Sequence, residues 1–507
     1  MSFPRASGIL LHPTSLPGRF GIGDLGKEAY QFADFLASTG QHVWQVLPLG
    51  PTGYGNSPYQ CLSVFAGNPL LISLERLVED KFLEPADLDD APFFPEDRVD
   101  YDSVIEFKTP LLKKSFEIFQ RKAVPSEREQ FEVFCRQNAS WLETYSLFMA
   151  LKEAHGLAAW NTWEEDIRRR QLKSLERWSK RLAHEIYYHK YQQYQFFKQW
   201  AELKKYCNER EIRLIGDMPI FIDLDSAEVW SRPEMFYLDD SGRPTVVAGV
   251  PPDYFSQTGQ LWGNPLYRWD VLAKDGYAWW IERFRTMCVL VDIVRLDHFR
   301  GFEKHWEVPG TDTTAINGRW VPGPGARLFE AVQKALGTLP IIAEDLGMIT
   351  PEVHALREQL DFLGMRVLQF AFSQDPGAEQ YRPHNYPRNC VVYTGTHDNN
   401  TTIGWFRGED VQDSTQSKEE REREKQFALK YLGTDGHELN WDFIRLALMS
   451  VADTAIIPMQ DILGLGSEAR MNIPGRLEGN WCWRFIPDML TEEIKARIKE
   501  LTALYGR

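Results

Sequence analysis

The sequence has few of the features that mark metal-binding, membrane or nucleic-acid-binding proteins. Its 507 residues include only six cysteines, with no C-x-x-C pair, so a zinc site is not expected. No apolar run approaches the roughly eighteen residues that a membrane-spanning helix needs. Positive charge is in deficit: 57 Lys and Arg against 72 Asp and Glu give a formal net charge of −15. Because nucleic acids and anionic membranes require a basic surface, we expect neither as a partner. We also expect no cofactor.

The start of the chain also lacks a signal for export. Met1–Arg5 is not followed by an apolar stretch, so no signal peptide is predicted. The scattered cysteines are interpreted as free thiols in a reducing compartment. We therefore predict a cytoplasmic protein, with a plastid stroma as an alternative if the source is a plant. The sequence leaves open whether it is a monomer or a homodimer.

Short apolar runs that end in polar residues recur along the chain and alternate with helical patterns. Most are nearly continuous in their apolar character, as expected of parallel strands that are covered on both sides. Helical spacing is clear at 25–38, 326–336 and 350–360. Eight strands that alternate with helices predict an α/β fold, a (β/α)₈ TIM barrel in a single domain over 1–507. The eight predicted strands are 8–15, 42–49, 212–219, 288–297, 340–345, 365–372, 390–398 and 454–461.

Two segments are too long to be simple loops of this barrel. Residues 70–210 follow the second strand and carry amphipathic helical patterns, so we predict a mostly helical inserted subdomain. Residues 223–270 follow the third strand and are rich in Gly, Pro and aromatics. They predict a loop-rich insertion that covers the active site.

Acidic residues stand where predicted strands end. Barrel enzymes carry their chemistry at the carboxyl ends of the strands, and five of the eight predicted strands end in carboxylates: Asp217, Asp297, Glu344 with Asp345, Asp398, and Asp461. Any one of these acids could form a stabilising salt bridge, but a cluster of strand-end acids is costly unless it is used. Asp292, on the buried face of the fourth predicted strand, has no partner that the sequence identifies.

Asp297 and Glu344 have the arrangement of a retaining glycosidic pair. Arg295 and Asp297 share one strand face, so Arg295 is expected to hold Asp297 ionised. Retaining chemistry needs a nucleophilic carboxylate about 5–5.5 Å from an acid/base carboxyl, which neighbouring barrel strands can supply. Glu344 must be protonated to act as the acid, and the charge of Asp297 would raise its pKa.

Three histidines, His12, His298 and His397, also fall at predicted strand ends. A lone histidine is more often structural, and metal ligation has no support from H-x-x-x-H or H-E-x-x-H spacing. We therefore favour a role as uncharged donors to sugar hydroxyls. The 17 Trp and 19 Tyr residues suit a groove that stacks sugar faces.

The order of these strand-end acids resembles the α-amylase superfamily, and the longer motifs resemble the 4-α-glucanotransferases of the amylomaltase (disproportionating enzyme) family, glycoside hydrolase family 77. The loop motifs at 54–60, 249–255, 259–265 and 343–347 are the most specific. The matching segments are GILLHPTSLP (8–17), YGNSPYQ (54–60), GDMPI (216–220), GVPPDYF (249–255), GQLWGNP (259–265), VRLDHFRG (294–301), AEDLG (343–347) and GTHDN (395–399). No additional carbohydrate-binding module is expected before the barrel.

The resemblance implies transfer of α-1,4-glucan segments from a maltooligosaccharide, starch or glycogen donor to the 4-hydroxyl of an acceptor, by retaining double displacement. Asp297 would be the nucleophile, Glu344 the acid/base, and Asp398 would bind the 2- and 3-hydroxyls of the distorted sugar. The residues implied to bind glucan are Tyr54, Ser57, Tyr59, Asp217, Asp253, Trp262, Asn264, Arg295, His298, Phe370, His397 and Asn472.

Two alternatives remain. The first is an α-glucan hydrolase with the same chemistry, because transfer requires that water be kept from the intermediate. Tyr254, Phe255 and Trp262 could exclude water, although they could equally pack within the insertion. The second is a non-catalytic glucan-binding protein, which the intact set of carboxylates disfavours.

Overall fold

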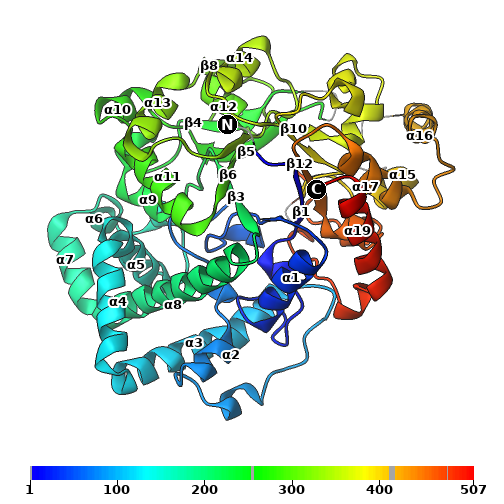
Figure 1. Ribbon diagram of the computed structural model, residues 1–507. Coiled ribbons are helices and arrows are strands. Elements are labelled where there is room, and N and C mark those ends of the chain that lie inside the picture. The colour runs from blue at the N-terminus through cyan, green and yellow to red at the C-terminus, as the bar shows by residue number, and fades with distance from the viewer. Residues whose placement is uncertain (1–2, 253–255, 410–416, 477) are drawn as a thin grey trace.

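A computed structural model describes residues 3–252, 256–409, 417–476 and 478–507 of the chain (Figure 1). Eight parallel strands form one sheet in the order β10-β11-β12-β1-β2-β3-β6-β9. A parallel bridge between Ile342 and Leu363 joins its two edges, so the sheet is nearly closed and the predicted barrel is confirmed. The strands are β1 (Ala6–Leu10), β2 (Val43–Gln45), β3 (Arg213–Pro219), β6 (Ile293–Asp297), β9 (Ile341–Ala343), β10 (Gly364–Val367), β11 (Cys390–Tyr393) and β12 (Thr454–Pro458).

Every predicted strand was drawn longer than the strand observed, in several cases because the predicted range includes part of a helix. Residues 288–290 belong to helix α11 (Ala278–Leu290), and a 3₁₀ helix, Leu368–Phe372, follows β10. Asp461 lies in helix α18 (Met459–Ile462), not at the end of β12. The reason is the same in each of these helical cases, because a short buried apolar run looks alike in a strand and in a helix.

Helices make up most of the segment between β2 and β3. The longest, α8, packs against α3, α4, α5 and α1 (Lys27–Ser38), and its apolar side buries large rings such as Tyr191, Phe196 and Trp200. The helices are α2 (Leu74–Glu79), α3 (Tyr101–Lys122), α4 (Pro125–Gln137), α5 (Ala139–Ala154), α6 (Glu165–Arg168), α7 (Leu172–Arg181) and α8 (Ala183–Asn208). The division of the chain into subdomains stays a prediction.

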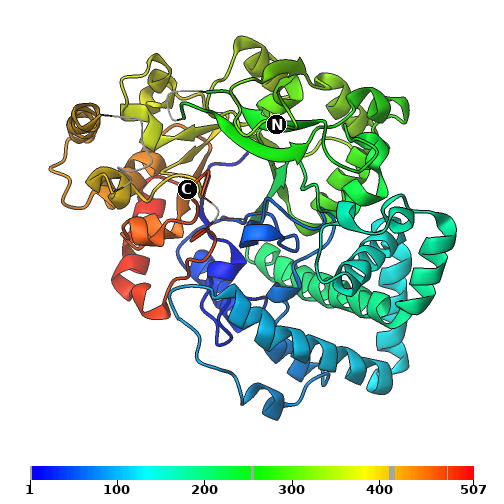
Figure 2. The same cartoon turned by 180° about the vertical axis from the view of Figure 1, so that it is seen from behind.

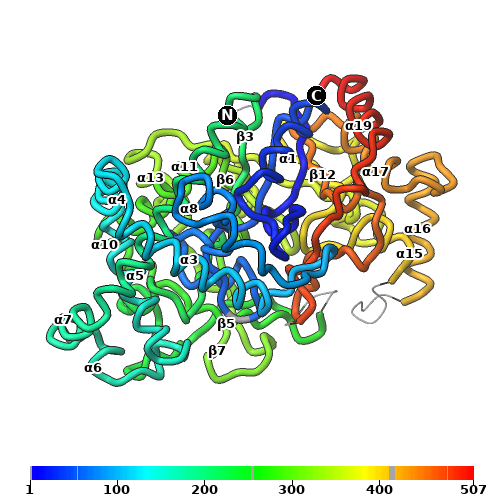
Figure 3. The backbone as a smooth tube through the Cα atoms, turned by 90° about the horizontal axis from the view of Figure 1, so that it is seen from below, coloured from blue at the N-terminus to red at the C-terminus, as the bar shows by residue number. Residues whose placement is uncertain are grey.

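The second insertion contributes to an antiparallel sheet. It contains α9 (Ala227–Ser231), β4 (Val246–Val250) and β5 (Gln260–Pro265), and α10 (Trp269–Lys274) begins at its end. The two strands join β7 (Lys304–Pro309) and β8 (Arg319–Pro322) in the order β5-β4-β7-β8. Figure 3 places β5 and β7 at the end of the molecule away from both termini. The expected loop-rich segment is therefore partly a sheet.

Further helices surround the barrel, as the view from behind also shows (Figure 2). They are α1 (Lys27–Ser38), α12 (Arg300–Glu303), α13 (Ala326–Leu336), α14 (Pro351–Gln359), α15 (Thr402–Arg407), α16 (Lys418–Leu432), α17 (Leu439–Met449) and α19 (Glu492–Leu504). Within the described ranges, no helix has both the length and the apolar character needed to cross a membrane.

Two open points of the sequence have structural answers. All six cysteines are free thiols, and four of them are buried. Asp292 precedes β6 rather than lying within it. Its Oδ2 accepts hydrogen bonds from the backbone N–H of Leu214 at 2.8 Å and from Asn208 Nδ2 at 2.9 Å, while Lys204 Nζ lies 3.4 Å from Oδ1. It therefore joins β3 to the start of β6.

Candidate active site

The pairing of three strands brings the predicted catalytic carboxylates together. In the β3–β6 ladder Asp217 is paired with Arg295, and in the β6–β9 ladder Leu296 is paired with Ala343. Asp297 and Glu344 each follow the residue of the second pair, so their backbones are neighbours at the carboxyl end of the barrel. The buried interiors of these strands fix the register, because a slip of one residue would turn every apolar side chain to the wrong face.

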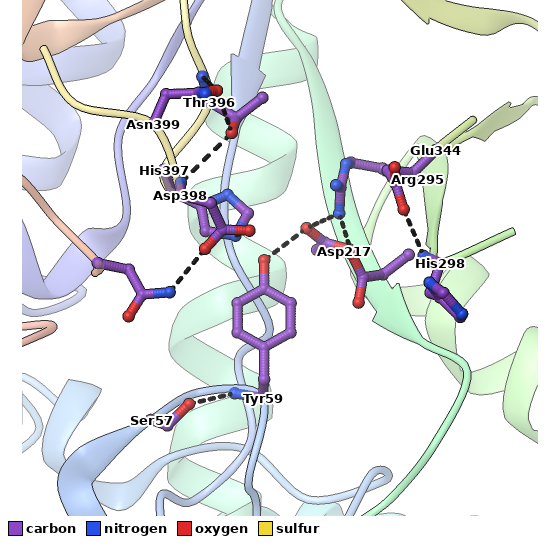
Figure 4. Close-up of polar contacts among 12 residues, drawn as sticks. Ser57, Tyr59, Asp217, Arg295, His298, Glu344, Thr396, His397, Asp398 and Asn399 are labelled. Carbon is purple, nitrogen blue, oxygen red and sulfur yellow. Dashed lines mark hydrogen bonds and ion pairs between the residues drawn. The ribbon is translucent and has the colours of Figure 1, made fainter. Parts of the chain in front are cut away.

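A chain of polar contacts connects the third and fourth barrel strands to an overlying loop (Figure 4). Arg295 Nη1 lies 2.6 Å from Asp217 Oδ2 and 3.0 Å from Asp297 Oδ1. Tyr59 Oη donates a hydrogen bond of 2.8 Å to the same oxygen of Asp217. Arg295 is only 3% exposed, so its position is strongly constrained. The guanidinium therefore sets the orientation of Asp297.

Glu344 is held by two backbone donors. The N–H of His298 donates to Oε2 and that of Leu346 to Oε1, each at 2.8 Å. His298 has a φ of 51°, which is uncommon for a residue other than glycine and costs free energy. The strained turn after β6 points this N–H at the Glu344 carboxyl group, directly after β9. Glu344 is thereby tied to the residue that follows Asp297.

Burial raises the pKa values of both carboxyls. The pKa of Asp297 rises to about 8, because desolvation and the charges of Asp217, Glu344 and Asp398 outweigh the opposing effect of Arg295. The pKa of Glu344 rises to about 7, mainly by desolvation, with Arg295 and the two backbone donors opposing. Arg295 acts in the predicted direction on Asp297, but desolvation and the neighbouring carboxylates outweigh it, so the expectation that Arg295 holds Asp297 ionised is not supported.

Asp398 follows β11 and is held by a C-terminal segment. Asn472 Nδ2 donates to Asp398 Oδ1 at 2.6 Å, and Arg470 Nη2 donates to the carbonyl oxygen of Asp398 at 2.7 Å. Arg470 Nε also donates to the carbonyl oxygen of Asn472. Asn472, which was predicted to bind glucan, therefore contacts a predicted catalytic carboxylate directly. Arg470 was not predicted, because nothing in its local sequence indicates its distance from Asp398.

The histidines at the site are kept neutral by burial. Desolvation lowers the pKa of His12 and of His298 to about 3 each. The pKa of His397 is lowered by the same cause, although Asp398 opposes the shift. The ring of His397 stacks on that of Tyr59 with centroids 5.1 Å apart, so one face of Tyr59 is already covered. Uncharged rings agree with the role that was expected of them.

Trp262 reaches the site from the second insertion. It lies on β5, and its ring meets that of His298 edge to face, with centroids 4.7 Å apart. Asn264, on the same strand, donates to the carbonyl oxygen of Ile222 at 3.0 Å, which fixes the insertion to the end of β3. Asp253 and its neighbours Tyr254 and Phe255 lie outside the described residues.

The remaining predicted binding residues lie on loops. Ser57 Oγ accepts the backbone N–H of Tyr59 at 3.3 Å, so it shapes the loop that carries this ring. Tyr54 begins the short 3₁₀ turn before it, Tyr54–Asn56. Phe370 is half-buried after β10, and its ring packs against Tyr381 at 5.4 Å.

Two predicted strand-end acids have structural partners instead. Asp345 is buried in an ion pair with Arg357 and accepts the backbone N–H of Met365. Asp461 is also buried, and its carboxyl accepts hydrogen bonds from Thr394 and Thr402. For these two acids the stabilising interpretation holds. Trp481 is a further residue that was not predicted, and its ring lies 5.6 Å from that of Tyr59.

Comparisons with known proteins agree with this geometry. Residues 11–489 match the family described as 4-alpha-glucanotransferase. The chain belongs to this family. It is 53% identical to a 4-alpha-glucanotransferase of Synechocystis sp. over 99% of this chain and 98% of the relative, and 52% identical to one from Thermus thermophilus over 99% of each. The structure of an amylomaltase from Streptococcus agalactiae in complex with acarbose superposes with a TM-score of 0.93 at 40% identity, covering 99% of each chain.

The predicted family, the barrel and the transferase class of the enzyme are thereby confirmed. The activity of this family is that of a 4-α-glucanotransferase. The roles of individual residues stay predictions, and they are developed below.

Proposed function

We propose that the chain transfers α-1,4-glucan segments by retaining double displacement, with Asp297 as nucleophile and Glu344 as acid/base. The observation that carries this proposal is the attachment of Glu344 to the backbone of His298, immediately after Asp297. This hydrogen bond holds the Glu344 carboxyl against the residue after Asp297, at the ends of two adjacent strands. We expect the separation of the two carboxyl groups to be about 5–5.5 Å, as retention requires.

In the first step, protonated Glu344 gives its proton to the glycosidic oxygen while an Asp297 oxygen bonds to the anomeric carbon. The bond to the leaving glucan breaks, and a covalent glucosyl ester forms on Asp297. In the second step, the 4-hydroxyl of an acceptor attacks the same carbon. Glu344 takes the hydroxyl proton and the ester bond breaks, which restores both carboxyls. Burial raises the pKa of Glu344 to about 7, close to the working pH that suits a general acid. In the reacting state the proton of the pair must lie on Glu344, because Asp297 attacks as a carboxylate.

Asp398 would accept hydrogen bonds from the 2- and 3-hydroxyls of the reacting sugar. Its side chain is 47% exposed, so a substrate can reach it, and Asn472 and Arg470 fix its direction. The neutral rings of His298 and His397 would donate to neighbouring hydroxyls. Contacts of this kind accelerate the reaction only if they strengthen in the transition state.

Transfer rather than hydrolysis requires an acceptor over the intermediate in place of water. Trp262, on the insertion, packs its ring against that of His298, whose backbone N–H donates to Glu344. We expect the Trp262 ring to stack on an acceptor sugar and to displace water. Donors would be maltooligosaccharides, starch or glycogen, and a reducing compartment such as the cytosol fits the free thiols.

Incubation with maltotriose tests the activity. A transferase yields glucose and a ladder of longer oligomers, with little net gain of reducing ends. A hydrolase yields only shorter products and a rising number of reducing ends. Asp297→Ala should abolish both patterns while the fold is retained. Unchanged glucan remodelling by that variant would refute the proposal, including its assignment of the nucleophile.

A further inference from the structure

A buried carboxylate outside the reaction centre anchors the loop that carries Tyr59. Glu228, in α9, is 5% exposed. Its Oε1 accepts a hydrogen bond of 2.6 Å from Ser63 Oγ, and its Oε2 accepts the backbone N–H of Val64 at 3.3 Å. The N–H of Ala227 also donates to the carbonyl oxygen of Leu62 at 2.9 Å. The start of α9 therefore fixes the chain directly after the Tyr59 loop.

The other side of this segment is fixed from α8. The side-chain amide of Gln193, which is fully buried, accepts the N–H of Gly67 at 2.7 Å and donates to its carbonyl oxygen at 2.9 Å. A Cβ atom at Gly67 would approach the ring of Phe196 to 1.9 Å, so the backbone is pressed against the helix. The segment between Leu62 and Gly67 is thus held between two helices.

A buried cation fixes the strand that Tyr59 contacts. Arg283, in α11, is 2% exposed, and it donates to the carbonyl oxygens of Pro219 and Ile220 at the end of β3. Asp217 lies two residues before Pro219. The charge of Arg283 also acts on Glu228, where it opposes the upward pKa shift that burial causes. Burying an ionisable side chain is costly. Here Glu228 and Arg283 each hydrogen-bond to one of the two chain segments that must meet.

These segments meet where Tyr59 Oη donates to Asp217 Oδ2 at 2.8 Å. The same Asp217 oxygen contacts Arg295, which in turn contacts Asp297. We propose that Glu228 is a positioning residue that sets the Tyr59–Asp217 contact, and through it the orientation of the guanidinium at Asp297. This inference rests on the proposed function. Glu228 itself contacts neither Asp297 nor Glu344 in the described structure.

Glu228→Gln changes one end of this connection. It keeps an acceptor for Ser63 but turns an amide N–H₂ toward the N–H of Val64, so one of the two contacts is lost. Small displacements of catalytic groups cost rate rather than affinity. We expect kcat for maltotriose disproportionation to fall about tenfold while KM stays within about twofold. The kcat of Glu228→Ala, which removes both contacts, should fall further.

A double-mutant cycle with Tyr59→Phe separates positioning from general destabilisation. If Glu228 acts through the Tyr59 hydroxyl, Glu228→Gln should lower kcat by less than about twofold in the Tyr59→Phe background, because coupled residues are not additive. Glu307→Gln is the matched control. Glu307 is a buried carboxylate paired with Arg319, and its replacement should leave kcat within about twofold.

Additive effects, or a wild-type kcat in Glu228→Gln, would overturn the role of Glu228. If Glu228→Gln does not fold, Ser63→Ala removes the shorter contact and enters the same cycle with the same expectation. A wild-type chain that forms no maltotriose ladder would refute the proposed function instead, so the two failures are distinguishable.

Discussion

Asn472→Ala removes the amide that donates to Asp398. The bond is 2.6 Å long and its acceptor is a carboxylate, a class worth about 1.5–3 kcal/mol. Asp398 is 47% exposed, so water can replace part of the lost bond, and the lower end of this range applies. About 1.5 kcal/mol corresponds to a loss of roughly tenfold in kcat/KM. We expect that loss because a less firmly held carboxylate binds the sugar hydroxyls less well in the transition state.

The assay is kcat/KM for maltotriose disproportionation, with the melting temperature measured alongside. Asn472→Asp should be worse than Asn472→Ala, because a second carboxylate would repel Asp398 at the same position. Asn385→Ala is the control: its amide donates to a backbone carbonyl on an exposed turn, and its kcat/KM should stay within about twofold. A wild-type kcat/KM in Asn472→Ala would refute the reasoning, as would an equal loss in the control.

Three further predictions concern the carboxyl pair and the insertion. The melting temperature of Asp297→Asn should rise relative to that of the wild type as the pH is raised from 5 to 8. The folded pKa of Asp297 is raised to about 8, above its unfolded value, so the wild-type fold loses stability over this range and the Asn variant does not. A constant difference would contradict this. Glu344→Gln should lose most activity on maltotriose but keep more on glucosyl fluoride, whose leaving group needs no acid, and the loss of rate at high pH should disappear. Equal losses on both donors would exclude Glu344 as the acid. Trp262→Ala should raise the ratio of reducing-end release to ladder formation severalfold, and an unchanged ratio would assign water exclusion elsewhere.

Apolar runs predicted the barrel correctly because each parallel strand is covered on both sides. They misplaced strand ends where the burial continues into a helix, as at Leu368–Phe372 and Asp461. The antiparallel sheet was missed for a different reason. Its strands β4 and β7 are separated along the chain by β5, three helices and a barrel strand, and no local pattern in either indicates that pairing.

The candidate site divides in the same way. Asp217, Arg295, Asp297 and Glu344 could be predicted to meet, because neighbouring parallel strands end at the same edge of the barrel. Arg470 and Trp481 could not, because they lie on an irregular segment far along the chain whose path depends on tertiary contacts. Glu228 was hidden for a similar reason, since its carboxyl acts on a loop 165 residues away in sequence.

Covalent trapping tests the central claim most directly. A slow fluorinated glucosyl donor should accumulate the glucosyl ester, and digestion followed by mass spectrometry should locate the label on Asp297. A label on any other residue, or no label under conditions in which the donor is consumed, would contradict the account.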